Sequence, residues 1–152
     1  MNKTVTFADL YPIIKEQLDA GGKAAFVIRG TSMLPMLKNG IDSVRIKKPE
    51  GRLKKYDIPF YRRKDGAFVL HRIVKVEKDY YVCRGDNQTV NEKYITDDMI
   101  IGVVEAFTEN EKWIDVTDEN YIKYAKKRVN TVFFLKLSRL FKALKRRIFG
   151  KG

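Results

Sequence analysis

The stretch Gly30-Thr31-Ser32-Met33-Leu34-Pro35-Met36-Leu37 directly follows a short apolar run, Ala24 to Ile28. That run favours a buried strand, and Gly30 lets the chain leave it in a conformation closed to bulkier residues. Ser32 is then expected on a tight turn, whose backbone N–H groups can hold an oxyanion if a base takes the hydroxyl proton. The alternative is a surface turn with an inert serine, because serines are common in turns.

A helix is predicted before this strand, and more strands are predicted after it. Thr6 is a plausible helix cap, apolar residues follow at helical spacing, and Gly21-Gly22 marks the end of the helix. The predicted strands are residues 24–28, 43–47, 57–61, 67–76, 80–84, 99–107 and 112–116. The pattern predicts a mainly β, barrel-like domain with an N-terminal helix.

Composition limits the class of protein. A chain of 152 residues with 44% hydrophobic content is long enough for one domain with its own core. Cys83 is the single cysteine, so no intramolecular disulfide can form, and its apolar neighbours predict a buried thiol. No signal peptide and no membrane-spanning run is recognisable, which predicts a cytoplasmic location.

The positive charge is concentrated at one end of the chain. Residues 121–152 contain 11 Lys or Arg and no Asp or Glu, whereas residues 1–120 hold 20 basic and 19 acidic residues. Almost all of the formal net charge of +12 therefore belongs to the last 32 residues. We predict a nearly neutral domain over residues 1–120 and a basic tail over residues 121–152.

His71 is the only histidine and lies within the predicted strand 67–76. Strand alternation places it on the same face as Val69 and Ile73, and an imidazole can accept a serine proton near neutral pH. A histidine that only fills a strand face is the alternative. No second histidine or further thiol is present to complete a metal site, so neither a metal nor another cofactor is expected.

An acid that orients this base is expected a short distance further along the chain. Asp86 lies in a marked turn, Gly85-Asp86-Asn87, and Glu92 follows it. Asp86 could instead bond its own backbone in an Asx turn. The pair Asp97-Asp98 is interpreted as a solvated turn.

Four motifs in this order and spacing resemble the signal peptidases and LexA-like serine peptidases, over roughly residues 26–107. The motifs are Gly30 to Leu37, Tyr56-Asp57-Ile58-Pro59-Phe60-Tyr61, Val69-Leu70-His71-Arg72-Ile73-Val74 and Arg84-Gly85-Asp86-Asn87-Gln88. The closer likeness is to the signal peptidase branch whose members carry a histidine in place of a lysine base.

The resemblance implies a mainly β peptidase fold with Ser32 as nucleophile and His71 as general base. It implies an acid partner for His71 at Asp86, or at Glu92 six residues further on. Lys75, four residues beyond His71, is the other basic side chain considered, and we interpret it as a solvated charge. Family members usually have Gly-Asp after the serine motif, whereas Ile41 intervenes here, and Gly30 leaves the second oxyanion donor unassigned.

The basic tail is predicted to form an amphipathic helix over residues 130–149. Its apolar face is formed by Phe133, Phe134, Leu137, Leu140, Phe141, Leu144 and Ile148. Such a helix suits an anionic membrane surface, which would place the protein peripherally on the inner face of the cell membrane. One alternative is a helix packed on the domain. The other is nucleic-acid binding, and the wide apolar stripe disfavours this second alternative.

The expected function is a serine endopeptidase of signal peptidase type that cleaves a peptide or removes the leader or signal of a preprotein. One alternative is a non-catalytic regulatory or membrane-binding module on the same fold. The other is a LexA-like self-cleaving regulator, for which Ala24-Ala25 and Gly21-Gly22 are the only small-residue cleavage candidates.

Overall fold

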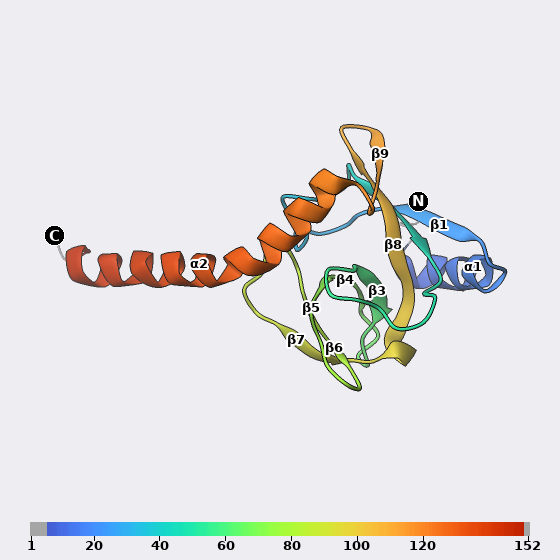
Figure 1. The fold of residues 1–152 in the computed structure, drawn as a ribbon, viewed down its shortest axis with the longest axis horizontal. Coiled ribbons are helices and arrows are strands. Elements are labelled where there is room, and N and C mark those ends of the chain that lie inside the picture. The colour runs from blue at the N-terminus through green and yellow to red at the C-terminus, as the bar shows by residue number, and fades with distance from the viewer. Residues whose placement is uncertain (1–5, 151–152) are drawn as a thin grey trace, which may run out of the picture.

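The computed structural model describes residues 6–150, with the side chains of residues 133–135 left out (Figure 1). The elements in chain order are α1 (Phe7–Asp19), β1 (Lys23–Val27), β2 (Ser43–Lys47), β3 (Pro59–Arg62), β4 (Phe68–Leu70), β5 (Arg72–Val76), β6 (Tyr81–Arg84), β7 (Glu92–Ile95), the short 3₁₀ helix η1 (Asp97–Met99), β8 (Ile100–Glu109), β9 (Lys112–Asp115) and α2 (Glu119–Phe149).

Two antiparallel sheets form the body of the molecule. The larger has the order β1-β2-β8-β3-β4 with β9 paired to β8, and the smaller has the order β5-β6-β7. The prediction of a β body is confirmed, but within residues 6–150 the sheets do not close into the predicted barrel. Helix and strand contribute equal shares, because α2 alone is 31 residues long, so the mainly β expectation is corrected to a mixed α/β fold.

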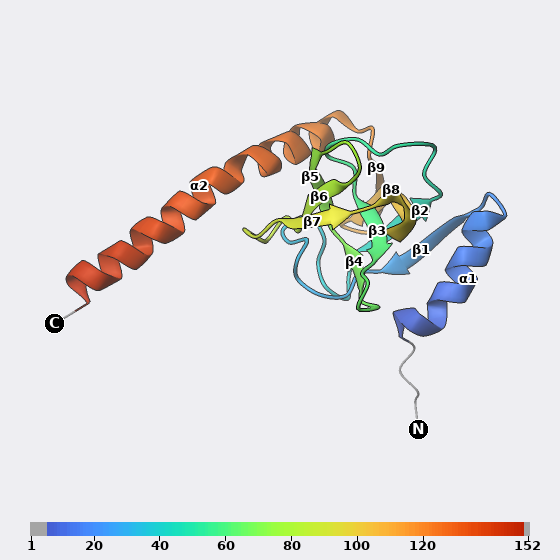
Figure 2. The same cartoon turned by 90° about the horizontal axis from the view of Figure 1, so that it is seen from below.

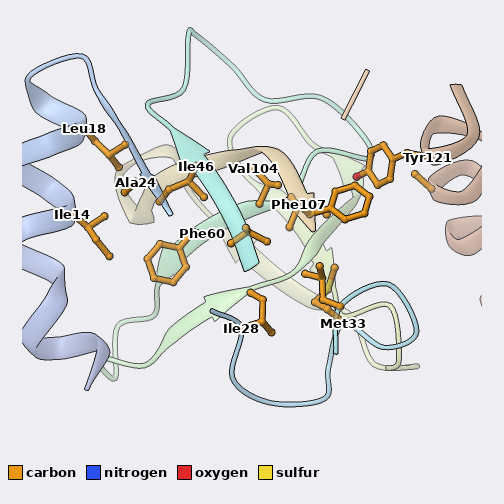
Figure 3. Close-up of a cluster of buried hydrophobic side chains, with 14 residues drawn as sticks. Ile14, Leu18, Ala24, Ile28, Met33, Ile46, Phe60, Val104, Phe107 and Tyr121 are labelled. Carbon is orange, nitrogen blue, oxygen red and sulfur yellow. The ribbon is translucent and has the colours of Figure 1, made fainter. Parts of the chain in front are cut away.

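The predicted N-terminal helix is confirmed as α1. Thr6 caps it in a capping box with Asp9, since each side chain accepts a hydrogen bond from the other residue's backbone N–H. Ile14 and Leu18 are its buried residues, and they join a core with side chains of the large sheet (Figure 3). The helix therefore covers one face of that sheet, and Gly21, with φ +80°, turns the chain into β1.

The predicted strand 67–76 is interrupted at His71. Residues 68–70 pair with β3 in the large sheet, whereas residues 72–76 pair with β6 in the small sheet. The backbone of Ile73 also exchanges hydrogen bonds with the segment before β3, through Tyr56 N–H and Asp57 C=O. The chain thus passes from one sheet to the other at His71, which ends the simple alternation predicted for its neighbours.

α2 has a packed first half and an exposed second half. Tyr121 and Ala125 lie in the same core as α1, and Val132 is buried further along the helix. From Lys136 onward every described side chain is exposed, and the helix extends away from the sheets (Figures 1 and 2). α2 begins at Glu119, next to the predicted boundary at residue 120, and its packed part continues to Val132. No helix in the described range has a stretch both long and apolar enough to cross a bilayer.

Candidate active site

Ser32 lies in the loop that joins β1 to β2. Gly30 begins the turn with φ +96°, and its N–H donates to Asn39 Oδ1 at 2.9 Å across the loop. The Ser32 side chain is half-buried. Among the described residues its backbone N–H has no acceptor, so this amide is available to donate to an oxyanion.

A second turn, Gly85 to Gln88, holds the serine loop in place. Asn87 donates its backbone N–H to Ser32 C=O at 2.8 Å and its side-chain amide to Thr31 C=O at 3.2 Å. A Cβ at Gly85 would lie 2.5 Å from the Ser32 carbonyl oxygen, closer than such atoms approach. Glycine at residue 85 therefore permits the close contact that fixes Ser32 against this turn.

His71 occupies the break between β4 and β5, and its residue is only 5% exposed. Its Nδ1 lies 3.4 Å from the Tyr61 hydroxyl and 3.6 Å from Glu92 Oε2. Burial lowers the pKa of His71 below its ordinary value of 6.5, and the Glu92 carboxylate offsets only part of this effect. The imidazole is therefore neutral near pH 7, as a general base must be.

Glu92 begins β7 and is the carboxylate beside His71. It accepts two hydrogen bonds from the Arg63 guanidinium, at 2.6 and 2.8 Å, and one from the Tyr61 hydroxyl at 2.8 Å. Burial acts to raise its pKa, but these hydrogen bonds outweigh it and the pKa is lowered. Glu92 therefore stays ionised, and the Arg63 fork fixes its orientation relative to His71.

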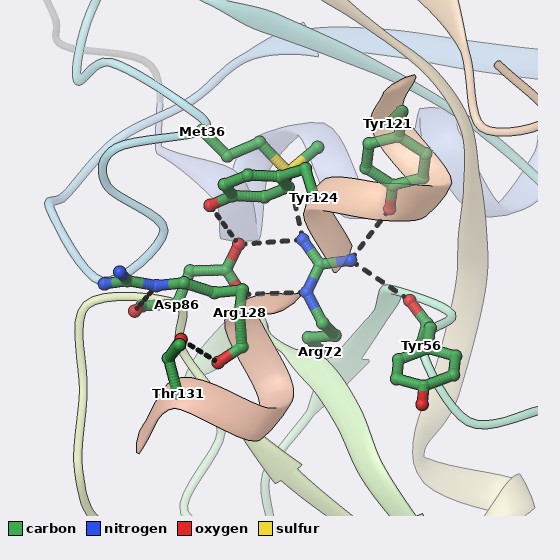
Figure 4. A network of polar contacts seen from close by, with 8 residues as sticks. All are labelled: Met36, Tyr56, Arg72, Asp86, Tyr121, Tyr124, Arg128 and Thr131. Carbon is green, nitrogen blue, oxygen red and sulfur yellow. Dashed lines mark hydrogen bonds and ion pairs between the residues drawn. The ribbon is translucent and has the colours of Figure 1, made fainter. Parts of the chain in front are cut away.

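Asp86, the other predicted acid, is held by a different partner (Figure 4). Its carboxylate accepts from Arg72 Nε at 2.8 Å and Nη2 at 2.7 Å, and from the Tyr124 hydroxyl at 2.9 Å. Arg72 is fully buried, so this pair is enclosed by protein. The structure therefore brings Glu92, rather than Asp86, up to the ring of His71.

The pair of Arg72 and Asp86 joins three parts of the molecule. Arg72 contacts Met36 Sδ in the serine loop at 3.1 Å and donates to the Tyr121 hydroxyl in α2 at 2.9 Å. Arg128, also in α2, donates to the Asp86 carbonyl oxygen at 2.6 Å. The network anchors α2 and the serine loop to the residue that follows His71.

Ser32 and His71 line the same pocket of about 240 Å³, although they come from different loops. Its wall combines polar residues with a set of apolar ones, which are Phe7, Phe26, Ile28, Met33, Phe60, Phe68, Val69 and Leu70. Within residues 6–150 no hydrogen bond joins the two side chains, and such contacts are often long before substrate binds.

His71 also lines a second pocket, of about 600 Å³. Arg63, His71 and Gln88 line both pockets, so the two form neighbouring parts of one recess. Glu92 and Arg139 of α2 also line the second pocket.

The two other reactive side chains considered from the sequence lie outside this recess. Lys75 is exposed, and its Nζ lies 2.5 Å from Glu77 Oε1. Cys83 is buried, and burial raises the pKa of its thiol to about 12, so it stays protonated. Among the described residues no cluster of His, Cys, Asp and Glu has a metal-binding arrangement.

The sequence analysis missed the residues that hold the carboxylates of Glu92 and Asp86 in place. Arg63, Tyr61 and Arg72 carry the contacts of the two acids, yet none of them was a candidate. Arg72 adjoins His71 in the sequence, which was the one available signal.

Comparisons with protein-family models, with curated proteins and with solved structures found no match to this chain.

Proposed function

We propose that this protein is a serine endopeptidase of signal peptidase type, which cleaves a peptide or removes the leader of a preprotein. The observation that carries the proposal is the pocket shared by Ser32 and His71. Glu92 beside His71 supports it further, because a carboxylate on one ring nitrogen leaves the other free to face a serine.

The proposed reaction uses these residues in sequence. His71 takes the proton of the Ser32 hydroxyl through Nε2 while the serine oxygen attacks the peptide carbonyl carbon. The oxyanion accepts a hydrogen bond from the Ser32 backbone N–H, and His71 returns the proton to the leaving amine. Water activated by His71 then hydrolyses the acyl-enzyme. Glu92 is a positioning residue, since it acts through His71.

The test is mass spectrometry of a mixed peptide library incubated with wild type, Ser32→Ala and His71→Ala. We expect cuts by wild type that fall by about 10³-fold or more in both variants, because nucleophile and base act as one unit. Lys75→Ala is the matched control, since Lys75 is basic and nearby in sequence but exposed, and it should cleave as wild type does.

Other outcomes would favour another function. Cuts that persist in Ser32→Ala would rule out Ser32 as the nucleophile. A library left intact by wild type would favour a non-catalytic module on the same fold.

Self-cleavage is the less favoured alternative. Ala24 and Ala25 lie within β1 and pair with Ile46 and Arg45 of β2, and Ala24 is buried. A peptidase needs an extended and accessible substrate, so β1 would have to leave its sheet before the chain could cut there.

A further inference from the structure

The second half of α2, residues 136–149, presents an apolar stripe that no described part of the chain covers. Leu140, Phe141 and Ile148 are 60%, 65% and 64% exposed, and Leu137 and Leu144 complete the stripe. An exposed stripe of this size on one helix is typical of a binding surface.

The stripe points away from the body of the protein. Tyr121, Ala125 and Val132 face the body, since all three are buried. At roughly 100° per residue along a continuous helix, the centre of the stripe lies about 135° around the helix from these three, and Leu140 is the stripe residue nearest to them. A flat surface could therefore contact the stripe without meeting the sheets.

Six basic residues share the remaining surface of this segment with Ser138, Ala143 and Phe149. The basic residues are Lys136, Arg139, Lys142, Lys145, Arg146 and Arg147, all exposed, and residues 136–150 contain no acidic residue. Lys136 and Arg147 lie at one edge of the stripe and Lys145 at the other. The partner of the stripe must therefore offer apolar material flanked by negative charge.

An anionic lipid surface offers both apolar material and negative charge, whereas a nucleic acid or a second copy of the helix offers only one of the two. A nucleic acid would neutralise the basic residues but leave the leucines and phenylalanine exposed to water. A second copy of the helix would cover the stripe but bring two sets of six like charges together.

We propose that residues 136–149 of α2 bind an anionic bilayer surface, with the helix parallel to the plane. The stripe enters the region between headgroups and acyl chains, Lys136, Arg147 and Lys145 contact lipid phosphates at its edges, and the other basic residues add to the long-range attraction by the anionic surface. This binding is independent of the proposed peptidase activity.

The test is flotation of the full chain with vesicles of phosphatidylcholine, with and without phosphatidylglycerol. We expect strong recovery with the anionic vesicles and weak recovery with the neutral ones. Lys142→Glu/Lys145→Glu should lower the partition coefficient by roughly 10- to 30-fold or more, because each basic residue contributes to attraction by the surface. Leu140→Ser/Leu144→Ser should lower it comparably.

The matched control is Lys78→Glu/Lys93→Glu, which makes the same charge change on exposed residues of the body and should float as wild type does. Equal flotation of wild type and both tail variants would overturn the proposal. The proposal would also be overturned if only the charge variant lost vesicle binding and wild type bound a DNA duplex as well as it bound anionic vesicles. That result would assign the basic residues to a site for any polyanion. A stable dimer in lipid-free buffer that Leu140→Ser/Leu144→Ser dissociates would assign the stripe to a second copy.

Discussion

His71 combines two opposing influences, and their balance sets the pH range in which it could act. Burial lowers its pKa, and the Glu92 carboxylate raises it, with burial the stronger effect. The neutral form, which the proposed mechanism requires, therefore predominates above a midpoint that lies below 6.5. The same shift affects stability, because the unfolded chain binds a proton more readily, so stability falls as pH drops from 6.5 toward the folded-state pKa.

Glu92→Gln tests which acid serves His71. The change removes a charge that raises the pKa of His71, so the acid limb of the kcat/KM profile should move to lower pH. Its plateau should fall by roughly 10- to 100-fold, because the imidazolium formed during proton transfer loses its nearby carboxylate. The measurement is kcat/KM against pH on a peptide that the wild-type protein cleaves.

Asp86→Asn is the control for that experiment. It leaves the guanidinium of Arg72 buried without its carboxylate, so the free energy of unfolding should fall by about 3–5 kcal/mol. The acid limb should move less than in Glu92→Gln, since Asp86 has the smaller effect on His71. The opposite ranking of the two shifts would make Asp86 the acid that acts on His71.

The sequence allowed Ser32 and His71 to be chosen, but not the partners of the two acids. Ser32 follows a recognisable strand and glycine, and His71 is the only histidine. Asp86 follows β6, where Arg84 pairs with Arg72 across the small sheet, so its carboxylate reaches Arg72 instead of His71. That register depends on a strand pairing that composition and spacing do not specify.

At the scale of elements, the sequence predicted where strands occur more successfully than where they end. The run 67–76 contains no breaker after Gly66, so nothing local marks its division into β4 and β5. The division comes from backbone hydrogen bonds with the segment before β3, which are tertiary contacts. β7 was also missed, because its four residues lack the alternation of a half-buried strand.

α2 supports a prediction about which part of the tail stabilises the fold. Tyr121 packs on Phe107 with ring centroids 5.1 Å apart, and Tyr124 donates to Asp86. A chain ending at Asn120 should lose about 4 kcal/mol or more of unfolding free energy, because these core contacts disappear together. A chain ending at Leu135 should stay within about 1 kcal/mol of wild type, since the residues it lacks are exposed.

Urea denaturation of the three chains measures these differences. Equal losses in both truncated chains would mean that the exposed half of α2 also stabilises the body. A chain ending at Asn120 that is as stable as wild type would show that the sheets need no helix on this side.

At the scale of the whole molecule, Arg139 links the exposed half of α2 to the candidate recess. Its guanidinium donates to Thr89 Oγ1 at 3.4 Å and lines the same pocket as His71 and Glu92. The recess therefore lies beside the exposed half of α2, on the side of the helix that faces the body and not on the side of the stripe. If both proposals hold, docking of the stripe would leave the recess about one helix diameter, roughly 10 Å, from the bilayer surface.

The resulting prediction compares one peptide substrate in two forms, free in solution and tethered to anionic vesicles. Wild type should cleave the tethered form faster by about tenfold or more at dilute peptide, because enzyme and substrate are concentrated on one surface. Lys142→Glu/Lys145→Glu should lose this advantage yet cleave the free peptide at the wild-type rate, since these residues are exposed and outside the pocket. Lys78→Glu/Lys93→Glu should still cleave the tethered peptide faster than the free one, as wild type does. An equal advantage in all three proteins would mean that the tether alone accelerates cleavage and that α2 does not bring the recess to the membrane.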